Sequence, residues 1–405
     1  MKSPTVTRAV FATALLAVLL IASLVPRSKV SAQSGRQPAK KSVEKKTDQQ
    51  KSADQQKGVE QPQEPVPPMS KDQKQEPAIK LSTQVVNVEV SVVDKKSGRL
   101  YTNLKKKSFT IYEDGVKQEV TNFASGEGPM TAVLLLENAF NNRYWQGYFN
   151  PSFAQEIFQA AGTFVQGFVK PDDHIAVVTF SMRPKVIQDF TGDRGRLYQA
   201  VSAAARDTLN FSEANIYDAL SFCLLGGKAV QLFDEERGEG QYTGVSEVEG
   251  HTAIILITLG RDTFSRITYD KTLKIISRAG VPIFCVHTGN LFYKKYGDSL
   301  PPETRMDFEQ ARNSLQTFAR YTGGAYFPMT FQSELPQIMQ SIQALLRTQY
   351  SLGYSPSNTR REGKERKIKL EVDIDGDGQP DNKQLDLRFR ERYVEPDDNP
   401  NLKKK

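Results

Sequence analysis

Between residues 132 and 346, short continuous apolar runs alternate with longer segments of helical period, and this alternation constrains the fold most. The apolar runs have the length of strands and cover residues 132–136, 174–180, 253–258, 281–286 and 325–327. Helical spacing of apolar residues recurs over 153–169, 193–205, 216–225, 269–278, 308–321 and 335–346. Strands that are apolar on both faces need helices on both sides of their sheet. The sequence therefore predicts an α/β domain, a doubly wound parallel sheet over residues 129–348.

Shorter β patterns flank this domain. Valines over 85–93 alternate with period 2 in the middle of the run, and the strands 109–112 and 116–123 are separated by Glu113-Asp114-Gly115, a hairpin signal. After residue 349 the strand pattern returns over 350–354, 366–372 and 384–390. We therefore expect an N-terminal β segment over residues 81–128, a C-terminal β segment over 349–395 and a basic tail over 396–405.

The first 32 residues have the organisation of a secretory signal peptide. Lys2 and Arg8 precede an apolar run, Pro26 ends it, and small residues up to Ala32 offer a cleavage site. An uncleaved N-terminal anchor is the alternative. Residues 33–80 are rich in Gln, Lys and Pro and contain too few apolar residues to offset the entropy of ordering, so we expect a disordered linker. Under both readings the rest of the chain is exported, to the periplasm or the medium.

The charge distribution argues against nucleic acid as a partner. The whole chain has a formal charge of +7, but residues 81–402 carry 37 basic and 40 acidic residues. The excess of positive charge thus lies in the segments outside residues 81–402 rather than on a folded surface. Three histidines and two cysteines exclude a zinc-finger array and a disulfide scaffold. Cys223 and Cys285 either pair outside the cytoplasm or stay free and buried, and the sequence leaves both open.

Four stretches resemble one known family. They are residues 86–90 leading to 109–118, the segment 216–220, the segment 321–327 and the segment 349–354. Together they resemble, in order, the acidobacterial proteins with a von Willebrand factor type A-related domain. The resemblance covers about residues 81–392. It implies a Rossmann-like type A domain flanked by β segments, and it leaves the partner open because such domains bind many proteins.

Type A domains often hold Mg²⁺ through a D-x-S-x-S motif after the first strand, a Thr in a second loop and an Asp after the fourth strand. The corresponding positions here are Glu137, Ala139, Asn141, Ala214 and Leu259. Three of them have no side-chain oxygen, which a hard cation requires, and Glu137 is one methylene longer than the usual Asp. We therefore expect a degenerate site without a metal ion.

A second ionic motif lies in the C-terminal β segment. The sequence from Asp373 to Asp381 fits D-x-D-x-D-G-x-x-D, with acidic residues at Asp373, Asp375, Asp377 and Asp381. Carboxylates at alternate positions converge on one calcium ion when the chain wraps around it. The alternative is an acidic hairpin tip, because Gln384 stands where a closing Glu is expected.

Aromatic residues follow the first strand of the α/β domain. Tyr144, Trp145 and Tyr148, with Arg143 beside them, are residue types that dominate binding hot spots. We consider them candidate partner-binding residues, with packing in the core as the alternative.

The sequence contains no recognisable arrangement of catalytic residues. His174, His251 and His287 stand at strand ends without a Ser or Cys at an informative spacing, so we interpret His287 as a polar strand-end residue. The glycine-rich segment 238–244 precedes a strand and is interpreted as a surface loop rather than a dinucleotide-binding loop.

These observations predict an exported, non-enzymatic protein-binding module with a metal-free type A domain. Its partner is a protein or a cell-envelope component, and it meets the membrane only if the N-terminal segment stays uncleaved. We expect docking at the sheet edge formed by the loops 137–150, 211–215, 259–264 and 287–293, because ligands of open α/β sheets bind beyond the carboxyl ends of the strands. An enzyme of unknown chemistry using the same crevice and a structural envelope tether are the alternatives.

Overall fold

A computed structural model of the 405-residue chain describes residues 85–125, 128–139, 151–206, 213–231, 240–248 and 250–396. All of them belong to one compact unit, Ile79–Lys405. The predicted signal peptide, linker and basic tail lie outside the described residues, apart from the first residue of the tail. No helix in the described ranges is both long and apolar enough to cross a membrane.

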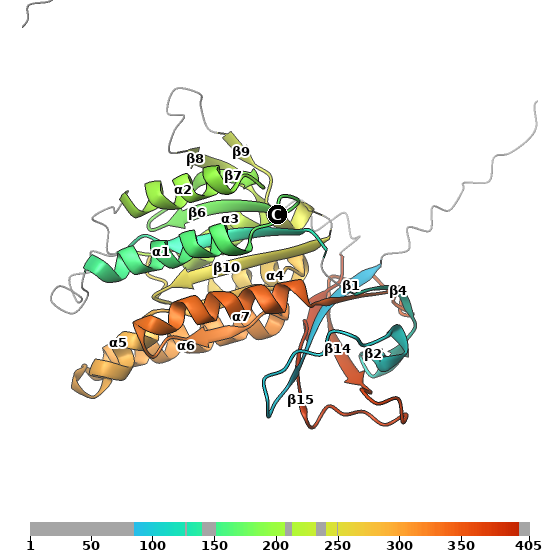
Figure 1. Cartoon of the computed structure of the whole chain (residues 1–405). Helices are drawn as coiled ribbons and strands as arrows, with labels where there is room; N and C mark the ends of the chain where they lie inside the picture. Colours follow the sequence, from blue (N-terminus) through green and yellow to red (C-terminus); the bar gives the residue numbers. More distant parts are fainter. Residues whose placement is uncertain are drawn as a thin grey trace, which may run out of the picture. The chain divides into compact units, whose positions relative to one another are not determined.

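The α/β domain alternates strands and helices as the periodicity predicts (Figure 1). Its strands are β5 (Met130–Glu137), β6 (His174–Phe180), β7 (Pro184–Thr191), β8 (Gly227–Gln231), β9 (Gly240–Tyr242), β10 (His251–Thr258), β11 (Ile283–His287) and β12 (Tyr326–Pro328). Its helices are α1 (Pro151–Phe168), α2 (Arg194–Arg206), α3 (Ile216–Leu225), α4 (Tyr269–Ala279), α5 (Gly289–Tyr296), α6 (Pro302–Thr322) and α7 (Leu335–Arg347). Short 3-10 helices are η2 (Val245–Glu247), η3 (Gly297–Ser299) and η4 (Gln332–Glu334).

The described strands of this domain form one sheet in the order β12-β11-β10-β5-β6-β7-β8-β9. The five strands from β12 to β6 are parallel, and β5, the first strand of the domain, lies inside the sheet rather than at its edge. The chain thus winds outward from β5 in both directions, which confirms the predicted doubly wound α/β class. The part beyond β6 departs from a purely parallel sheet, because β7 pairs antiparallel with β6 and β9 pairs antiparallel with β8.

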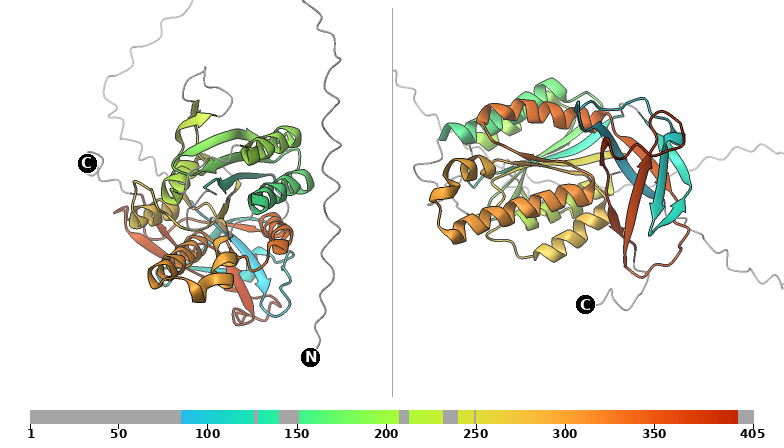
Figure 2. Two further views of the ribbon diagram at one scale, coloured as in Figure 1. Left: turned by 90° about the vertical axis from the view of Figure 1, so that its left-hand side faces the viewer. Right: turned by 90° about the horizontal axis from the view of Figure 1, so that it is seen from below.

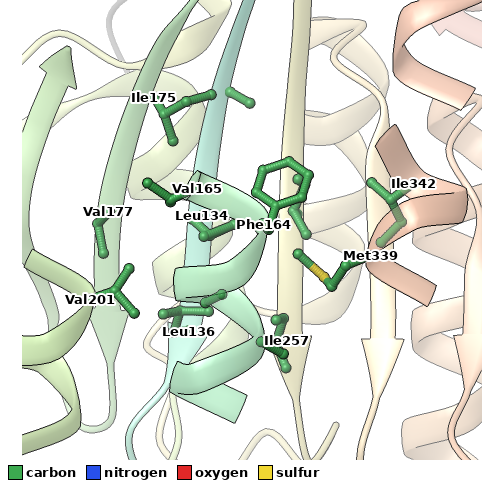
Figure 3. Packing of buried hydrophobic residues seen from close by; sticks show 14 of the residues in the cluster. Leu134, Leu136, Phe164, Val165, Ile175, Val177, Val201, Ile257, Met339 and Ile342 are labelled. Carbon is green, nitrogen blue, oxygen red and sulfur yellow. The ribbon is translucent and has the colours of Figure 1, made fainter. Parts of the chain in front are cut away.

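Each face of the sheet has its own apolar core, which explains why the central strands are apolar along their whole length. Leu134, Phe164 and Met339 belong to the core under α1, α2 and α7 (Figure 3). On the other face Leu135, Leu220 and Phe318 pack under α3, α4 and α6. Figure 2 shows the two helical layers with the sheet between them. Alternate residues of β5 therefore face opposite cores, as the pleat requires.

One strand was not predicted, and two local predictions are corrected. The segment 184–191 forms β7, which its weak alternation did not reveal. The glycine-rich segment 238–244, interpreted as a surface loop, contributes β9, and Tyr242 in it is buried against Phe222. The expected loop 287–293 contains the start of α5, which begins at Gly289. In each case tertiary packing orders a segment whose own pattern is too short to specify a structure.

The two β segments that flank the α/β domain form a single β unit. Its strands are β1 (Val86–Asp94), β2 (Phe109–Glu113), β3 (Val116–Gln118), β4 (Val120–Ala124), β13 (Tyr350–Tyr354), β14 (Glu365–Val372), β15 (Leu385–Arg388) and β16 (Arg392–Val394), with the 3-10 helix η1 (Lys106–Ser108) before β2. They pair in the orders β15-β1-β13-β4 and β16-β14-β2-β3, so each sheet combines N-terminal and C-terminal strands. Val88, Ile111, Leu352 and Leu370 share its apolar core.

The β unit contacts the amino edge of the large sheet, where the parallel strands begin. Glu89 of β1 lies beside His251, the first residue of β10. Arg320 near the end of α6 forms an ion pair with Glu391 at 3.9 Å. The opposite edge, where the parallel strands end, is called the carboxyl edge below.

Candidate functional site

Three neighbouring strands end in polar residues at the carboxyl edge. Glu137 is the last residue of β5, Thr258 the last of β10 and His287 the last of β11. These strands are parallel neighbours, and Thr258 pairs directly with His287, so their ends lie side by side. All three side chains are buried. These three buried residues lie beneath the surface of the carboxyl edge, where the sequence predicts that a partner docks.

Glu137 occupies the place of the metal-binding Asp, and its carboxylate is engaged by the protein itself. Oε2 accepts hydrogen bonds from Thr258 Oγ1 at 2.5 Å and from the Leu259 backbone N–H at 2.7 Å. Burial raises the pKa of Glu137 to about 7, against the lowering effect of these two hydrogen bonds. Near neutral pH the side chain therefore exchanges between a carboxylic acid and a carboxylate.

The other described positions of the degenerate site offer no side-chain oxygen. Ala139, Ala214 and Leu259 are at most 5% exposed and pack with the apolar core or around it. Asn141 lies outside the described residues. Among the described positions, only Glu137 carries a ligand type that Mg²⁺ uses, and one of its oxygens already holds two protein donors. The residues present thus do not fit a magnesium site.

The loop after β10 is fastened to the start of α3. Thr263 Oγ1 accepts a hydrogen bond from Ala214 N at 2.9 Å, and Thr263 N donates to Ala214 O at 2.8 Å. Asp218 accepts from the backbone N–H groups of Arg266 and Ile267 at 3.0 and 3.1 Å. These bonds hold the loop in one conformation, so the edge presents a preorganised surface.

His287 continues the polar network on the other side of the loop. Its Nε2 lies 3.1 Å from the Leu259 carbonyl oxygen, which can only accept, and its Nδ1 lies 2.8 Å from the Tyr326 hydroxyl. The proton therefore sits on Nε2, and Tyr326 donates to Nδ1. Burial lowers the pKa of His287 to about 4, so the ring is neutral at physiological pH. This confirms a polar strand-end residue.

Exposed apolar side chains line the same edge, and the sequence reasoning missed them. Phe264 follows β10, Met306 lies near the start of α6 after β11, and Phe331 follows β12. They are 49%, 69% and 65% exposed. Arg261 of the β10 loop also reaches Asp307, next to Met306, through an ion pair of 2.8 Å. Isolated apolar residues in polar segments carry no periodic signal, and only the strand order shows that they share an edge.

The predicted aromatic binding residues are not placed by the structure. Arg143, Tyr144, Trp145 and Tyr148 all lie in the segment 140–150, outside the described residues. They follow β5, whose last residue is Glu137 at the carboxyl edge. Their role as partner-binding residues stays a prediction.

The structure brings three of the four predicted calcium ligands together. Carboxylate oxygens of Asp373, Asp375 and Asp377 lie within 4.8 Å of one another. Asp381 is not in this group: its Oδ2 accepts from Ile374 N at 2.8 Å, and its Oδ1 accepts from Gln384 Nε2 at 2.7 Å. The structure thus groups three of the four predicted ligands, and the fourth, Asp381, accepts hydrogen bonds within the same loop.

The two cysteines do not pair. Cys223 in α3 and Cys285 in β11 are both free and fully buried. Burial raises the pKa of both thiols far above its ordinary value, so neither is a thiolate near neutral pH.

No protein-family model and no curated protein matches this chain. Among solved structures, the proximal thread matrix protein 1 from the mussel byssus is 15% identical, with a TM-score of 0.38 over 56% of this chain and 48% of its own. A von Willebrand factor type A protein from Catenulispora acidiphila is 9% identical, with a TM-score of 0.37 over 80% of this chain and 76% of its own. BatB from Bacteroides thetaiotaomicron is 13% identical, with a TM-score of 0.33 over 55% of this chain and 100% of its own.

The fold itself rests on the sheet described above. Its strands wind outward from β5 in both directions, helices cover both faces, and β strands from both ends of the chain flank it. The chain therefore has a Rossmann-like, doubly wound α/β fold flanked by N- and C-terminal β segments, which is the fold that its resemblance to the type A-related proteins implies.

Proposed function

We propose that this chain is an exported, non-enzymatic protein-binding module that recognises its partner at the carboxyl edge without a metal ion. The observation that carries the proposal is the exposure of three apolar residues at the carboxyl edge, Phe264 in the loop after β10, Met306 in the first turns of α6 and Phe331 after β12. Exposed apolar side chains on ordered segments bind a protein surface by burying area, without a large entropic cost of ordering. The predicted residues Arg143, Tyr144, Trp145 and Tyr148 extend the same surface in this proposal.

The metal-free part of the proposal rests on Glu137. A type A site that binds Mg²⁺ leaves coordination positions for a partner carboxylate, whereas here the Glu137 carboxylate binds Thr258 and Leu259. Binding energy then comes from apolar contact and hydrogen bonds rather than from an ion. We expect millimolar Mg²⁺ or Mn²⁺ to leave the melting temperature unchanged, since a ligand stabilises only the state it binds. The metal-free part of the proposal is contradicted if either ion raises the melting temperature, and if Glu137→Gln abolishes this rise while Asp375→Asn leaves it in place.

An enzyme is the alternative, and the lining of one hollow supports it poorly. This hollow of about 550 Å³ lies between α1 and α7. Its lining has no titratable side chain and comprises Ala160, Thr163, Phe164, Phe168, Ser333, Pro336, Gln337, Met339 and Gln340. Acid–base catalysis needs a titratable group that reaches the substrate. Glu137 and His287 do titrate, but both are buried in hydrogen bonds to the protein.

Export and attachment follow from the N-terminal sequence in this proposal. The mature protein begins near Gln33, and residues 33–80 serve as a linker that separates the module from what precedes it. N-terminal sequencing of native protein tests the cleavage, and a chain that starts at Met1 favours the anchored form. A structural tether, the third alternative, predicts that the linker alone is sufficient to hold the envelope component.

The decisive experiment is partner capture by immobilised protein from a native envelope extract, with cross-linking and identification of stoichiometric proteins. Phe264→Ala and Phe331→Ser reduce capture, by about thirtyfold for a true hot spot, and leave the melting temperature unchanged because both residues are exposed. Trp145→Ala and Tyr148→Ala extend the test to the predicted residues. Val116→Ser is the matched control, since Val116 is 56% exposed but lies on the β unit. Equal capture by all variants rejects the carboxyl edge as the binding surface.

A further inference from the structure

The amino edge of the sheet holds a second polar contact, which is independent of partner binding. Along β1, Val86, Val88 and Val90 point into the core of the β unit, so Glu89 projects from the opposite face of the strand. Glu89 Oε1 accepts a hydrogen bond from Ser351 Oγ at 2.8 Å, and Oε2 lies 3.4 Å from His251 Nδ1. The carboxylate is thus fixed on the β unit and faces the α/β domain.

His251 is held equally firmly on its own side. It is the first residue of β10 and pairs with Met130 of β5. Its ring packs on Gly128, where a Cβ atom would come within 2.9 Å of Cδ2. The His251 side chain is 20% exposed and the Glu89 side chain 13%. Two ionisable groups from different parts of the fold therefore meet in a contact that is largely shielded from water.

We propose that Glu89 and His251 form a proton-dependent clamp between the β unit and the α/β domain. Without a proton on Nδ1, an imidazole lone pair faces a carboxylate oxygen, and two acceptors repel each other. With the proton, the contact becomes a hydrogen bond, and a fully protonated ring adds the attraction of opposite charges in a partly buried site. The contact is therefore strongest when the ring is fully protonated, because a neutral ring donates to Glu89 only in the tautomer that carries its proton on Nδ1.

The surrounding charges act in both directions. Arg347 at the end of α7 lies close enough to oppose protonation of His251, but it forms a buried ion pair with Asp173, which precedes β6. Arg390, before β16, acts electrostatically on the Glu89 side of the contact. The hydrogen-bonding contact with Glu89 has the largest effect and raises the pKa of His251, burial lowers it, and the charge of Glu89 raises it again, so that the pKa lies above its ordinary value of 6.5.

The direction of the pH dependence follows from this shift. A histidine whose pKa is raised on folding contributes stability that is complete below its unfolded pKa and is lost as the pH rises through its folded pKa. The clamp is thus strongest in mildly acidic solution and weakens above pH 6.5, at a value set by the folded pKa. Loosening of this contact weakens the attachment of the β unit to the sheet.

The first test is a proton titration of the histidine ring resonances in the full chain by NMR, which is tractable because the chain has three histidines. His251 titrates above 6.5 in the unaltered protein, and Glu89→Gln lowers its pKa. His174→Asn is the matched control, since His174 is the exposed first residue of β6, and it leaves the titration of His251 unchanged. A His251 pKa at or below 6.5, or one that Glu89→Gln does not move, overturns the proposal.

The second test measures the loss of melting temperature between pH 6 and pH 8. Glu137 contributes to this loss in every variant that keeps it, so the comparison is between variants. The melting temperature of His251→Asn falls less between the two pH values than that of the unaltered protein, because the clamp no longer titrates. The melting temperature of His174→Asn falls by as much as that of the unaltered protein. If His251→Asn keeps the whole pH dependence, the contact does not clamp the two parts.

Discussion

A single buried carboxylate determines how the carboxyl edge responds to pH. Burial raises the pKa of Glu137 to about 7, so the folded protein keeps a proton that the unfolded chain has lost above about pH 4.3. The stability that this proton contributes is complete below the unfolded pKa and is lost as the pH rises through 7. The difference between the folded and the unfolded pKa of Glu137 corresponds to a contribution on the order of 3 kcal/mol to the free energy of unfolding.

We therefore expect Glu137→Gln to reduce the loss of stability between pH 5 and pH 8. The neutral amide keeps an oxygen for Thr258 and Leu259 and never ionises. Chemical denaturation at the two pH values measures the difference. Glu213→Gln is a control at the same edge, because it removes a carboxylate from a partly exposed position. If both variants keep the pH dependence of the unaltered chain, Glu137 does not titrate near neutrality.

At the scale of elements, the loop between β14 and β15 is the candidate calcium site. Asp373 already accepts backbone hydrogen bonds from Gly376 at 2.6 Å and Gly378 at 2.9 Å, and both glycines have positive φ angles of 82° and 87°. These bonds shape the loop and, with the Gly378 bond first, lower the pKa of Asp373 below its ordinary value. Asp375 and Asp377 are more exposed and complete the group.

We predict that Ca²⁺ binds this loop weakly, with a dissociation constant of about 10⁻⁴–10⁻³ M, as in extracellular modules. Calorimetry at several millimolar Ca²⁺ detects the heat, and Asp375→Asn with Asp377→Asn abolishes it. Asp381→Asn decides whether the fourth carboxylate takes part: binding survives if Asp381 only closes the loop. No heat from the unaltered chain means that the loop is an acidic hairpin tip.

The end of α7 is joined to the sheet by a buried ion pair. Arg347 Nη1 donates to Asp173 Oδ1 at 2.9 Å, and Asp173 also accepts from the backbone N–H groups of Met130 and Lys170. Both side chains are at most 4% exposed. Removal of one partner leaves a buried charge without compensation, which typically costs about 3–5 kcal/mol.

Asp173→Asn is therefore expected to lower the melting temperature by more than about 5 °C. The double variant Asp173→Asn with Arg347→Met recovers part of the loss, because no unpaired charge remains. Arg320→Gln is the control, since its ion pair with Glu391 is largely exposed, and it changes stability by less than about 1 kcal/mol. A double variant as unstable as the single one argues against charge as the cause.

At the scale of the whole molecule, the β unit depends on both ends of the chain. β1 pairs with β13 along one side and with β15 along the other, so its core residues are covered by strands from the C-terminal segment. A buried network adds to this: Arg366 of β14 donates to Glu113 of β2, which also accepts from Tyr354. Neither segment can bury its apolar face alone.

We predict that deletion of residues 349–405 exposes the apolar face of β1 and β2. The shortened protein binds a hydrophobic dye and aggregates, whereas deletion of residues 397–405 alone leaves the melting temperature unchanged. Dye fluorescence and light scattering measure the two outcomes. A soluble, cooperatively unfolding product of the larger deletion shows that the N-terminal segment folds without its C-terminal strands.

Local pattern was sufficient for the central strands and for most of the helices of the α/β domain, although not for β7, β9 and α5. The strand 174–180 and the helix 216–225 have the predicted bounds. A buried strand and a helix each require a characteristic spacing of apolar residues, which can be recognised in the sequence. The hairpin at Glu113-Asp114-Gly115 follows from backbone chemistry, with Asp114 and Gly115 at positive φ. The sequence also shows that Ala139, Ala214 and Leu259 have no side-chain oxygen, and the expectation of a metal-free site rests on this.

Only the tertiary structure decided which of these parts meet. It joined the two β segments into one unit, placed Phe264, Met306 and Phe331 on one edge, and set Glu89 against His251. It also showed that Asp381 lies outside the group of three carboxylates and that its two oxygens accept hydrogen bonds from other residues. The physical reason is that period and turn chemistry act between residues close in the chain, whereas strand order, exposure and side-chain pairing depend on the packing of segments far apart in it.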